Sequence, residues 1–269
     1  KIGLISNHSA LDRQSRNILD LMQASKNVQL VAVFAPEHGF YGKADEKIKN
    51  TKDEKTGMKI YSLYDDTRVP TKEELKGIDT LVFDIQDIGA RFYTYTSTMA
   101  MCMKTAAENN IEFIVFDRPN PITGLRVDGP IQDEDLYKKF TGYFPQPIIH
   151  GMTIGELAKM FNEYYGIQCK LTVVEMKGWK RNMFFDETGM PWINPSPNIR
   201  NVTQEILYPA IALTEAGESN ISVGRGTDSP FEVLGAPWID ADKLVQEMKS
   251  RNIPGVDFVA IHFTPTESK

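Results

Sequence analysis

The sequence predicts an α/β fold in which a Rossmann-like parallel sheet occupies about residues 1–125. Three observations support this prediction. Four short apolar runs have the composition of strands that are buried on both faces. Segments with helical periodicity lie between these runs, which is typical of βαβ units. Polar side chains follow each run, as expected where the carboxyl ends of parallel strands form a binding edge.

The predicted strands of this sheet cover residues 2–6, 29–34, 80–84 and 111–117. Between them, apolar residues recur at helical spacing in residues 13–24 and 98–109, and a shorter helical pattern covers residues 72–76. With 269 residues, of which 41% are hydrophobic, the chain is long enough to bury a sizeable core.

The second half of the chain begins with a turn-rich hinge at residues 119–124. Thr153 and Glu156 have the spacing of a capping box and predict a helix that ends near Gly166. Strands are predicted at residues 168–176 and 259–263, and His262 in the latter is expected in the core. Residues 192–198 contain too many prolines for regular structure.

Composition and motifs exclude several classes of function. A net charge of −6 and a pI near 5.4, without a long Lys/Arg run, argue against a nucleic-acid partner. No stretch has the roughly 18 apolar residues of a membrane span. The first strand-to-helix turn lacks the glycine patterns of dinucleotide and P-loop sites, so no cofactor is expected. Cys102 and Cys169 are interpreted as buried free thiols.

Polar groups at the carboxyl ends of the four strands predict a shared cleft. They are Asn7 and His8, Glu37 and His38, Asp84 with Gln86 and Asp87, and the segment from Asp117 to Asn120. Open α/β sheets bind ligands at this edge.

The third of these loops, residues 86–96, combines an acid, a flexible glycine, Arg91 and the aromatic residues Phe92, Tyr93 and Tyr95. Such a mixture suits a sugar, whose apolar face stacks on rings while its hydroxyl groups bond to charged partners. Tyr93 and Tyr95 fit a core position equally well, and His150 fits a structural role better than a place in the cleft.

Six motifs occur in one order along the chain: residues 36–40 (PEHGF), 86–95 (QDIGARFYTY), 117–121 (DRPNP), 150–158 (HGMTIGELA), 195–198 (PSPN) and 224–227 (GRGT). With these motifs the chain, from Gly3 to about Phe263, resembles the exo-β-N-acetylmuramidase family, long catalogued as a domain of unknown function. The resemblance implies a bacterial enzyme of cell-wall recycling that removes β-linked N-acetylmuramic acid from the non-reducing end of peptidoglycan fragments.

The resemblance also implies an architecture and a location. The Rossmann-like domain at residues 1–125 would be followed by a smaller α+β domain at residues 126–269, with the active-site cleft between them. We expect the second domain to be incomplete at its C-terminal end. The implied substrate is a small muropeptide or disaccharide that carries N-acetylmuramic acid, and the implied location is extracytoplasmic.

The glutamate of the PEHG motif, Glu37, is the catalytic acid that the resemblance implies. Glycosidases protonate the leaving oxygen with one carboxyl group while a second carboxylate supports attack at the anomeric carbon. Asp84 or Asp87 is expected to be that second group, and His38 is expected to assist Glu37. Either the carboxylate acts directly, or the acetamido oxygen of the substrate attacks and the carboxylate orients it.

Muramic acid differs from N-acetylglucosamine by a lactyl carboxylate, which calls for a fixed cation with bidentate geometry. Arg91, Arg118 and Arg225 are the candidates, and Arg225 lies on a flexible, glycine-rich backbone. The predicted substrate-binding residues are Asn7, His8, Arg91, Tyr93, Tyr95, Arg118, Asn120, Asn198 and Arg225.

Two other classes of protein fit parts of this pattern. The side chains of His8, Glu37, His38, Asp84 and Asp87 are of types that bind divalent metals, as in a metal-dependent amidase or deacetylase. No HExxH motif or similar spacing accompanies them, and no metal is expected. A non-catalytic module that binds wall sugars would use the same aromatic residues and arginines.

Overall fold

The structure, a computed structural model, describes residues 1–43, 48–217 and 219–267. The chain forms two compact units, Lys1–Val202 and Thr203–Lys269. The boundary predicted between residues 125 and 126 lies inside the first unit, because strand β7 (Leu171–Val174) joins the same sheet next to β6 (Glu112–Phe116). The hinge-like composition of residues 119–124 therefore belongs to a loop within the first unit.

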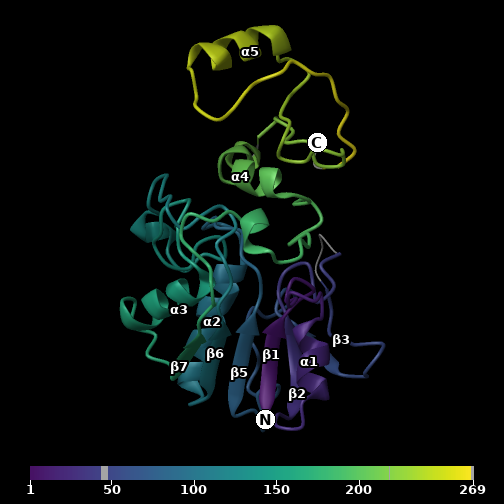
Figure 1. Cartoon of the computed structure of the whole chain (residues 1–269), viewed down its shortest axis with the longest axis vertical. Helices are drawn as coiled ribbons and strands as arrows, with labels where there is room; N and C mark the ends of the chain where they lie inside the picture. Colours follow the sequence, from purple (N-terminus) through teal and green to yellow (C-terminus); the bar gives the residue numbers. More distant parts are fainter. Residues whose placement is uncertain (44–47, 218, 268–269) are drawn as a thin grey trace. The chain divides into compact units, whose positions relative to one another are not determined.

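The predicted parallel sheet is confirmed (Figure 1). The four predicted strands are β1 (Ile2–Ser6), β2 (Leu30–Ala35), β5 (Thr80–Asp84) and β6, and all of them run parallel. Three strands extend this set, namely β3 (Thr51–Lys52), β4 (Lys59–Ser62) and β7. Only β3 is antiparallel to its neighbour among the described strand pairs.

The strand order is β3-β4-β2-β1-β5-β6-β7. From β1 the chain builds outwards through β2 and β4, then returns to the other side of β1 with β5. The direction of winding therefore reverses between β1 and β5, and open α/β sheets bind ligands beside the carboxyl ends of strands at such a reversal. The order places the loops after β1, β2 and β5 next to one another.

The strands are apolar because the sheet is covered on both faces. Leu4, Ile5, Val33, Phe34 and Phe83 are fully buried in consecutive strands, so both faces of the sheet contribute to the core. Cys102 and Cys169 are free and buried, as predicted.

Two of the three helical patterns in the first half form helices, α1 (Ile18–Ala24) and α2 (Tyr95–Glu108). Helix α1 begins later than predicted because the Asp12 carboxylate accepts hydrogen bonds from the backbone N–H groups of Gln14 and Arg16 and holds them in a turn. Asn17 then caps the helix. The prediction for residues 72–76 is wrong, since they form turns that end at Gly77, where φ is +79°.

The capping box at Thr153 and Glu156 is confirmed at the start of helix α3 (Ile154–Glu163). Asp117, which follows β6, accepts hydrogen bonds from the Gly155 N–H group at 2.7 Å and from the Thr153 hydroxyl at 3.1 Å. Burial raises the pKa of Asp117, while these hydrogen bonds act in the opposite direction. Asp117 therefore fixes the start of α3 against the sheet.

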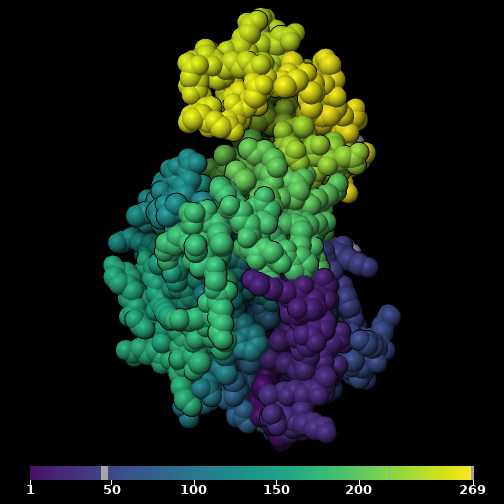
Figure 2. Space-filling model, viewed as in Figure 1, coloured from purple at the N-terminus to yellow at the C-terminus, as the bar shows by residue number. Residues whose placement is uncertain are grey.

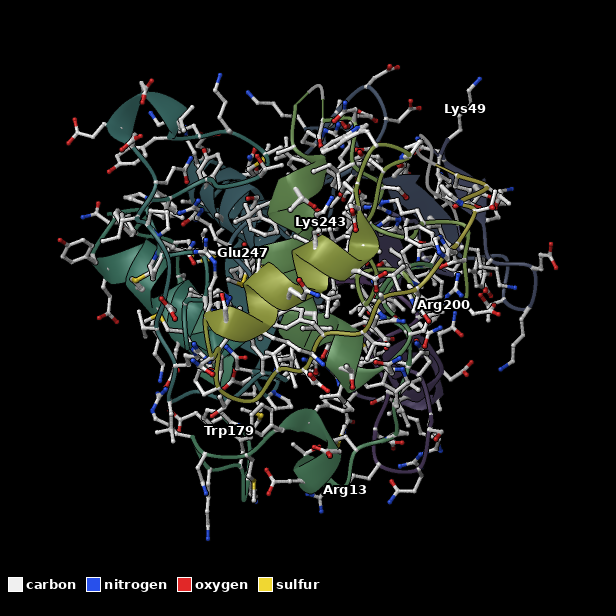
Figure 3. All side chains as sticks on the ribbon, turned by 90° about the horizontal axis from the view of Figure 1, so that it is seen from above. Arg13, Lys49, Trp179, Arg200, Lys243 and Glu247 are labelled. Atoms are coloured by element: carbon white, nitrogen blue, oxygen red, sulfur yellow. The ribbon has the colours of Figure 1, made fainter. Side chains whose placement is uncertain are left out.

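The second unit contains helix α5 (Ala241–Ser250) and most of α4 (Val202–Ile211). Phe231 is buried and packs edge-on against Tyr208, with ring centres 4.8 Å apart. Helix α5, which carries Lys243 and Glu247 (Figure 3), buries none of its residues. The strand predicted at residues 259–263 is wrong: the backbone there is irregular, and His262 is exposed rather than in the core.

Short 3₁₀ helices occupy Glu134–Leu136, Phe185–Thr188 and Ala212–Glu215. In the part of the chain that the structure describes, every helix is too short or too polar to cross a membrane.

Candidate functional site

The candidate site lies at the carboxyl edge of the sheet in the first unit. Glu37 and His38 follow β2, and the side chain of Glu37 is partly exposed. The Glu37 carboxylate accepts a hydrogen bond of 2.5 Å from the hydroxyl of Thr94, which lies at the start of α2 and makes no side-chain capping bond there. His38 has a φ of +67° and Gly39 a φ of +70°. A left-handed conformation at a histidine costs free energy, and such strain is concentrated at functional sites.

Tyr64 connects Glu37 to a further strand end. This residue follows β4, and its hydroxyl lies close enough to the Glu37 carboxylate for that group to raise the pKa of Tyr64. Burial is the main reason why the pKa of Tyr64 is raised, and the negative charge of Glu37 raises it further. Glu37 therefore has two hydroxyl groups around it, one from α2 and one from the loop after β4.

Asn7 and Tyr95 form a buried network behind Glu37. The Asn7 Nδ2 atom donates to the Tyr95 hydroxyl at 3.1 Å, and this hydroxyl donates to the Pro195 carbonyl at 2.8 Å. Tyr95 is fully buried and packs edge-on against Tyr93, with ring centres 4.8 Å apart. Burial raises the pKa of Tyr95, and the nearby carboxylates of Glu37 and Asp87 act in the same direction. Tyr95 is therefore a core residue that lies close to both acids.

Asp87 forms a buried pair with His150, which was predicted to be structural. The Met152 N–H group donates to His150 Nδ1 at 3.2 Å, so the proton of a neutral imidazole is on Nε2. Nε2 lies 3.2 Å from Asp87 Oδ2, which also accepts from the Gly89 N–H group at 2.8 Å. Among the described residues, Asp87 Oδ1 is buried without a hydrogen-bond partner. One oxygen is thus fixed, while the other is buried and has no partner among the described residues.

Asp84 and Arg118 form a buried ion pair with each other. Arg118 Nε donates to Asp84 Oδ1 at 2.5 Å, and the side chains are only 11% and 4% exposed. Arg118 Nη1 also donates to the Leu11 carbonyl at 3.2 Å. The charges of both residues are neutralised within the fold, which favours a structural role over the roles predicted for them in catalysis and substrate binding.

The other two arginine candidates also have partners. Arg91 Nη1 donates to the carbonyls of Pro130 and Gln146 at 2.9 and 2.5 Å, and burial lowers the pKa of Arg91. Arg225 belongs to the second unit, where it forms a bidentate ion pair with Glu215 at 2.8 and 2.7 Å. A guanidinium that already binds a carboxylate is a poor receptor for another one.

Two predicted binding residues stabilise loops around the edge. Asn120 Nδ2 donates to the Met152 carbonyl at 3.0 Å, and its Oδ1 accepts from the Ile122 N–H group at 3.1 Å. Asn198 is buried in the proline-rich loop, 4% exposed. This loop is an ordered part of the edge, because Pro195 accepts the hydrogen bond of Tyr95.

His8 joins the N-terminal segment to the same loop. Its Nε2 atom lies 2.6 Å from the Asn194 carbonyl, and burial lowers its pKa. Arg13 Nη2 reaches the Thr188 carbonyl at 3.4 Å, and Figure 2 shows the purple N-terminal segment beside green segments of the first unit. Gly42, with φ of +67°, leaves room for the His8 ring, since a Cβ atom there would lie 1.8 Å from His8 Cε1.

The arrangement includes a cation that the sequence patterns do not indicate. The guanidinium of Arg68 contacts two neighbouring rings, 3.9 Å from the centre of Tyr64 and 4.4 Å from that of Phe140. Its Nη1 atom is buried and lacks a hydrogen-bond partner within the described residues. Arg68 belongs to the loop after β4, a strand that was not predicted, so nothing in the sequence placed this loop at the edge.

The residues of the metal hypothesis do not converge on one point. Within residues 1–43, 48–217 and 219–267, no three His, Cys, Asp or Glu side chains are grouped closely enough to hold a metal ion. Asp84 bonds to Arg118 instead, and Asp87 bonds to His150.

Comparison with known families identifies the family of the chain. The N-terminal domain described as exo-beta-N-acetylmuramidase NamZ matches residues 2–203, and the C-terminal domain of the same description matches residues 206–269. The chain belongs to the NamZ family. The boundary between the two NamZ domains falls where the structure divides into its two compact units.

The chain is 48% identical over 271 residues to the peptidoglycan beta-N-acetylmuramidase NamZ of Bacillus subtilis (strain 168). The match covers 100% of this chain but only 65% of that NamZ protein. Two crystal structures of DUF1343 family proteins from Bacteroides fragilis NCTC 9343 are also similar. One is 43% identical with a TM-score of 0.92, and the match covers 100% of this chain and 68% of the chain in that structure. The other is 40% identical with a TM-score of 0.74, and the match covers 88% of this chain and 62% of the chain in that structure.

Proposed function

We propose that this chain carries the catalytic site of a glycoside hydrolase that removes β-linked N-acetylmuramic acid from the non-reducing end of peptidoglycan fragments. The observation that carries the proposal is Glu37, a partly exposed carboxyl group at the edge of the sheet with the Thr94 and Tyr64 hydroxyls around it. Membership of the NamZ family and the activity given in the name of the Bacillus subtilis relative, a peptidoglycan beta-N-acetylmuramidase, support the same chemistry.

Glu37 acts as the general acid in this proposal. It donates its proton to the glycosidic oxygen as the bond to the anomeric carbon breaks, so that the leaving sugar departs as an alcohol. The hydrogen bond from the Thr94 hydroxyl holds the carboxyl group in one orientation, and the Tyr64 hydroxyl lies nearby. His38 follows Glu37 directly in the chain and has a strained backbone, and we assign it to the same reaction centre.

Asp87 is the better candidate for the second carboxylate. The charges of both Glu37 and Asp87 raise the pKa of the buried Tyr95 hydroxyl, so both carboxylates lie near it. Asp84, in contrast, is already bound in its ion pair with Arg118. Asp87 is held by His150 through Oδ2 while Oδ1 lacks a partner among the described residues. An oriented carboxylate of this kind either supports attack at the anomeric carbon directly or positions the acetamido group of the substrate for attack.

The surrounding residues would bind the sugar. Asn7, His8 and Asn198 line or support the edge of the sheet, and Tyr93 packs on Tyr95 beneath it. Because the proposed substrate is a cell-wall fragment, we also propose that the protein works outside the cytoplasm, in the periplasm or cell envelope.

The proposal is tested with the disaccharide in which N-acetylmuramic acid is β-linked to the 4-position of N-acetylglucosamine. Mass spectrometry should detect both free sugars, and reduction of the reducing end before the reaction should not prevent cleavage, since an exo-enzyme starts from the other end. Activity should persist with a chelator. No release of N-acetylmuramic acid, by this chain or by a longer form of the protein, would contradict the proposal, and loss of activity with the chelator would favour metal-dependent hydrolysis.

A further inference from the structure

The three arginines predicted to recognise the lactyl carboxylate are engaged elsewhere. Arg118 is paired with Asp84, Arg225 with Glu215, and Arg91 donates to backbone carbonyls. A substrate carboxylate would have to displace these partners, which would leave a buried charge or carbonyl without compensation.

Arg68 lacks such a partner. Across the described ranges no carboxylate forms an ion pair with Arg68, and its buried Nη1 atom donates no hydrogen bond. The rings of Tyr64 and Phe140, whose centres are 5.8 Å apart, both contact the guanidinium, with 3.9 and 4.4 Å between the guanidinium carbon and the ring centres. These aromatic contacts supply no acceptor to Nη1, so this nitrogen remains a donor with which the group can bind an anion.

The position of Arg68 relative to Glu37 suits one sugar ring. The Tyr64 ring that contacts Arg68 carries a hydroxyl close enough to Glu37 for the carboxylate to raise its pKa, so a single tyrosine side chain lies near both the cation and the acid. In muramic acid the lactyl ether is on O3, and C3 is separated from the anomeric carbon, which carries the glycosidic oxygen, by C2 alone. A sugar with its glycosidic oxygen at Glu37 would thus direct its lactyl group towards a cation about one ring away.

We propose that Arg68, in contact with the rings of Tyr64 and Phe140, binds the lactyl carboxylate of N-acetylmuramic acid and selects this sugar over N-acetylglucosamine. This inference rests on the proposed function for the identity of the anion. Arg68 is a specificity residue in this account, whereas Glu37 performs the chemistry. The planar guanidinium matches a carboxylate with two parallel N–H···O bonds, which a lysine cannot reproduce.

The test compares Arg68→Met with the unchanged protein on nitrophenyl β-glycosides of N-acetylmuramic acid, its lactyl methyl ester and N-acetylglucosamine. We expect Arg68→Met to lower kcat/KM for the acid on the order of 100-fold, as for loss of a charge-assisted bidentate contact. Its kcat/KM for the other two substrates should stay within about threefold. Arg68→Lys should give an intermediate loss, because it keeps the charge without the planar fork.

Two further variants separate recognition from folding. Arg13→Met removes an exposed arginine of the same unit (Figure 3) and should leave all three substrates unaffected. Phe140→Leu keeps the cation but removes one of the two rings that contact it, so selectivity for the acid should fall by about tenfold. The melting temperature of Arg68→Met, compared with that of Arg13→Met, shows whether the Arg68 variant is folded.

Direct binding distinguishes failure of this inference from failure of the proposed function. Calorimetry with the free sugars should show that the unchanged protein prefers N-acetylmuramic acid to N-acetylglucosamine and that Arg68→Met loses the preference. An unchanged preference in a folded Arg68→Met variant would overturn the role of Arg68, whether or not the protein cleaves any substrate. A protein that binds N-acetylmuramic acid through Arg68 but cleaves none of the glycosides would contradict the proposed hydrolase instead.

Discussion

The Asp84–Arg118 pair is predicted to contribute to stability rather than to substrate recognition. The two side chains are 4% and 11% exposed, so Arg118→Met leaves the Asp84 carboxylate buried without its partner. Removing one member of such a pair costs about 3–5 kcal/mol of the free energy of unfolding. The lost hydrogen bond to the Leu11 carbonyl adds about 1 kcal/mol. Because a typical domain has only about 5–15 kcal/mol, the variant should be strongly destabilised.

Urea unfolding of the first unit measures this effect. Trp179 and Trp192 lie in the first unit and Trp238 in the second, so a Trp238→Phe background makes tryptophan fluorescence report on the first unit alone. Arg126→Met is the matched control. Its pair with Asp128 is 3.2 Å long, but the side chains are 68% and 55% exposed, so the loss should be below about 1 kcal/mol.

The double variant Asp84→Asn with Arg118→Met should recover part of the loss, since no charge is then left buried alone. The selectivity of the folded fraction for muramyl over glucosaminyl substrates should be unchanged. A stability loss in Arg118→Met no larger than in Arg126→Met would refute the structural interpretation. Normal stability of Arg118→Met combined with lost selectivity would instead support a role of Arg118 in substrate binding.

Three further predictions concern the neighbourhood of the site. Burial lowers the pKa of His8 below its ordinary value of 6.5, so as the pH falls the unfolded chain takes up a proton before the folded one. Stability should therefore decrease from about pH 7 to about pH 5, and His8→Gln should reduce this slope in urea titrations; parallel slopes would contradict the assignment. Thr153→Ala removes the cap of α3 and a hydrogen bond to Asp117, and should cost about 1–2 kcal/mol, whereas Asp240→Ala at exposed α5 should cost less. Thr94→Val should lower kcat about tenfold without a comparable change in the melting temperature, because valine has no hydroxyl to orient Glu37. An unchanged kcat would show that Thr94 has no role in the reaction.

The sequence identifies the sheet well because its central strands are apolar on both faces. The runs that become β1, β2, β5 and β6 are buried on both sides, which leaves continuous hydrophobic stretches that periodicity detects. Strand β4 is short and half-exposed, with Lys59 and Tyr61 alternating with buried residues, so its pattern is weak. Missing β4 also meant missing Tyr64 and Arg68, which follow it.

Partners within the site could not be predicted from residue type. Asp84 and Asp87 are separated by only two residues and look equivalent in the sequence, yet the fold pairs the first with Arg118 and the second with His150. Both partners come from segments far away along the chain. The same holds for Arg225, whose flexible glycine-rich surroundings suggested an anion site but whose charge is met by Glu215.

The role of Glu37 as general acid is the central claim, and the dependence on the leaving group tests it most directly. Glu37→Gln should lower kcat for the disaccharide by about 10²–10⁴-fold, since the sugar alkoxide is a poor leaving group without protonation. For a dinitrophenyl muraminide, which leaves without a proton, the loss should be below about tenfold. Glu73→Gln, at an exposed glutamate, should leave kcat unchanged for both substrates. Equal losses on both substrates, or an active Glu37→Gln variant on the disaccharide, would contradict the account.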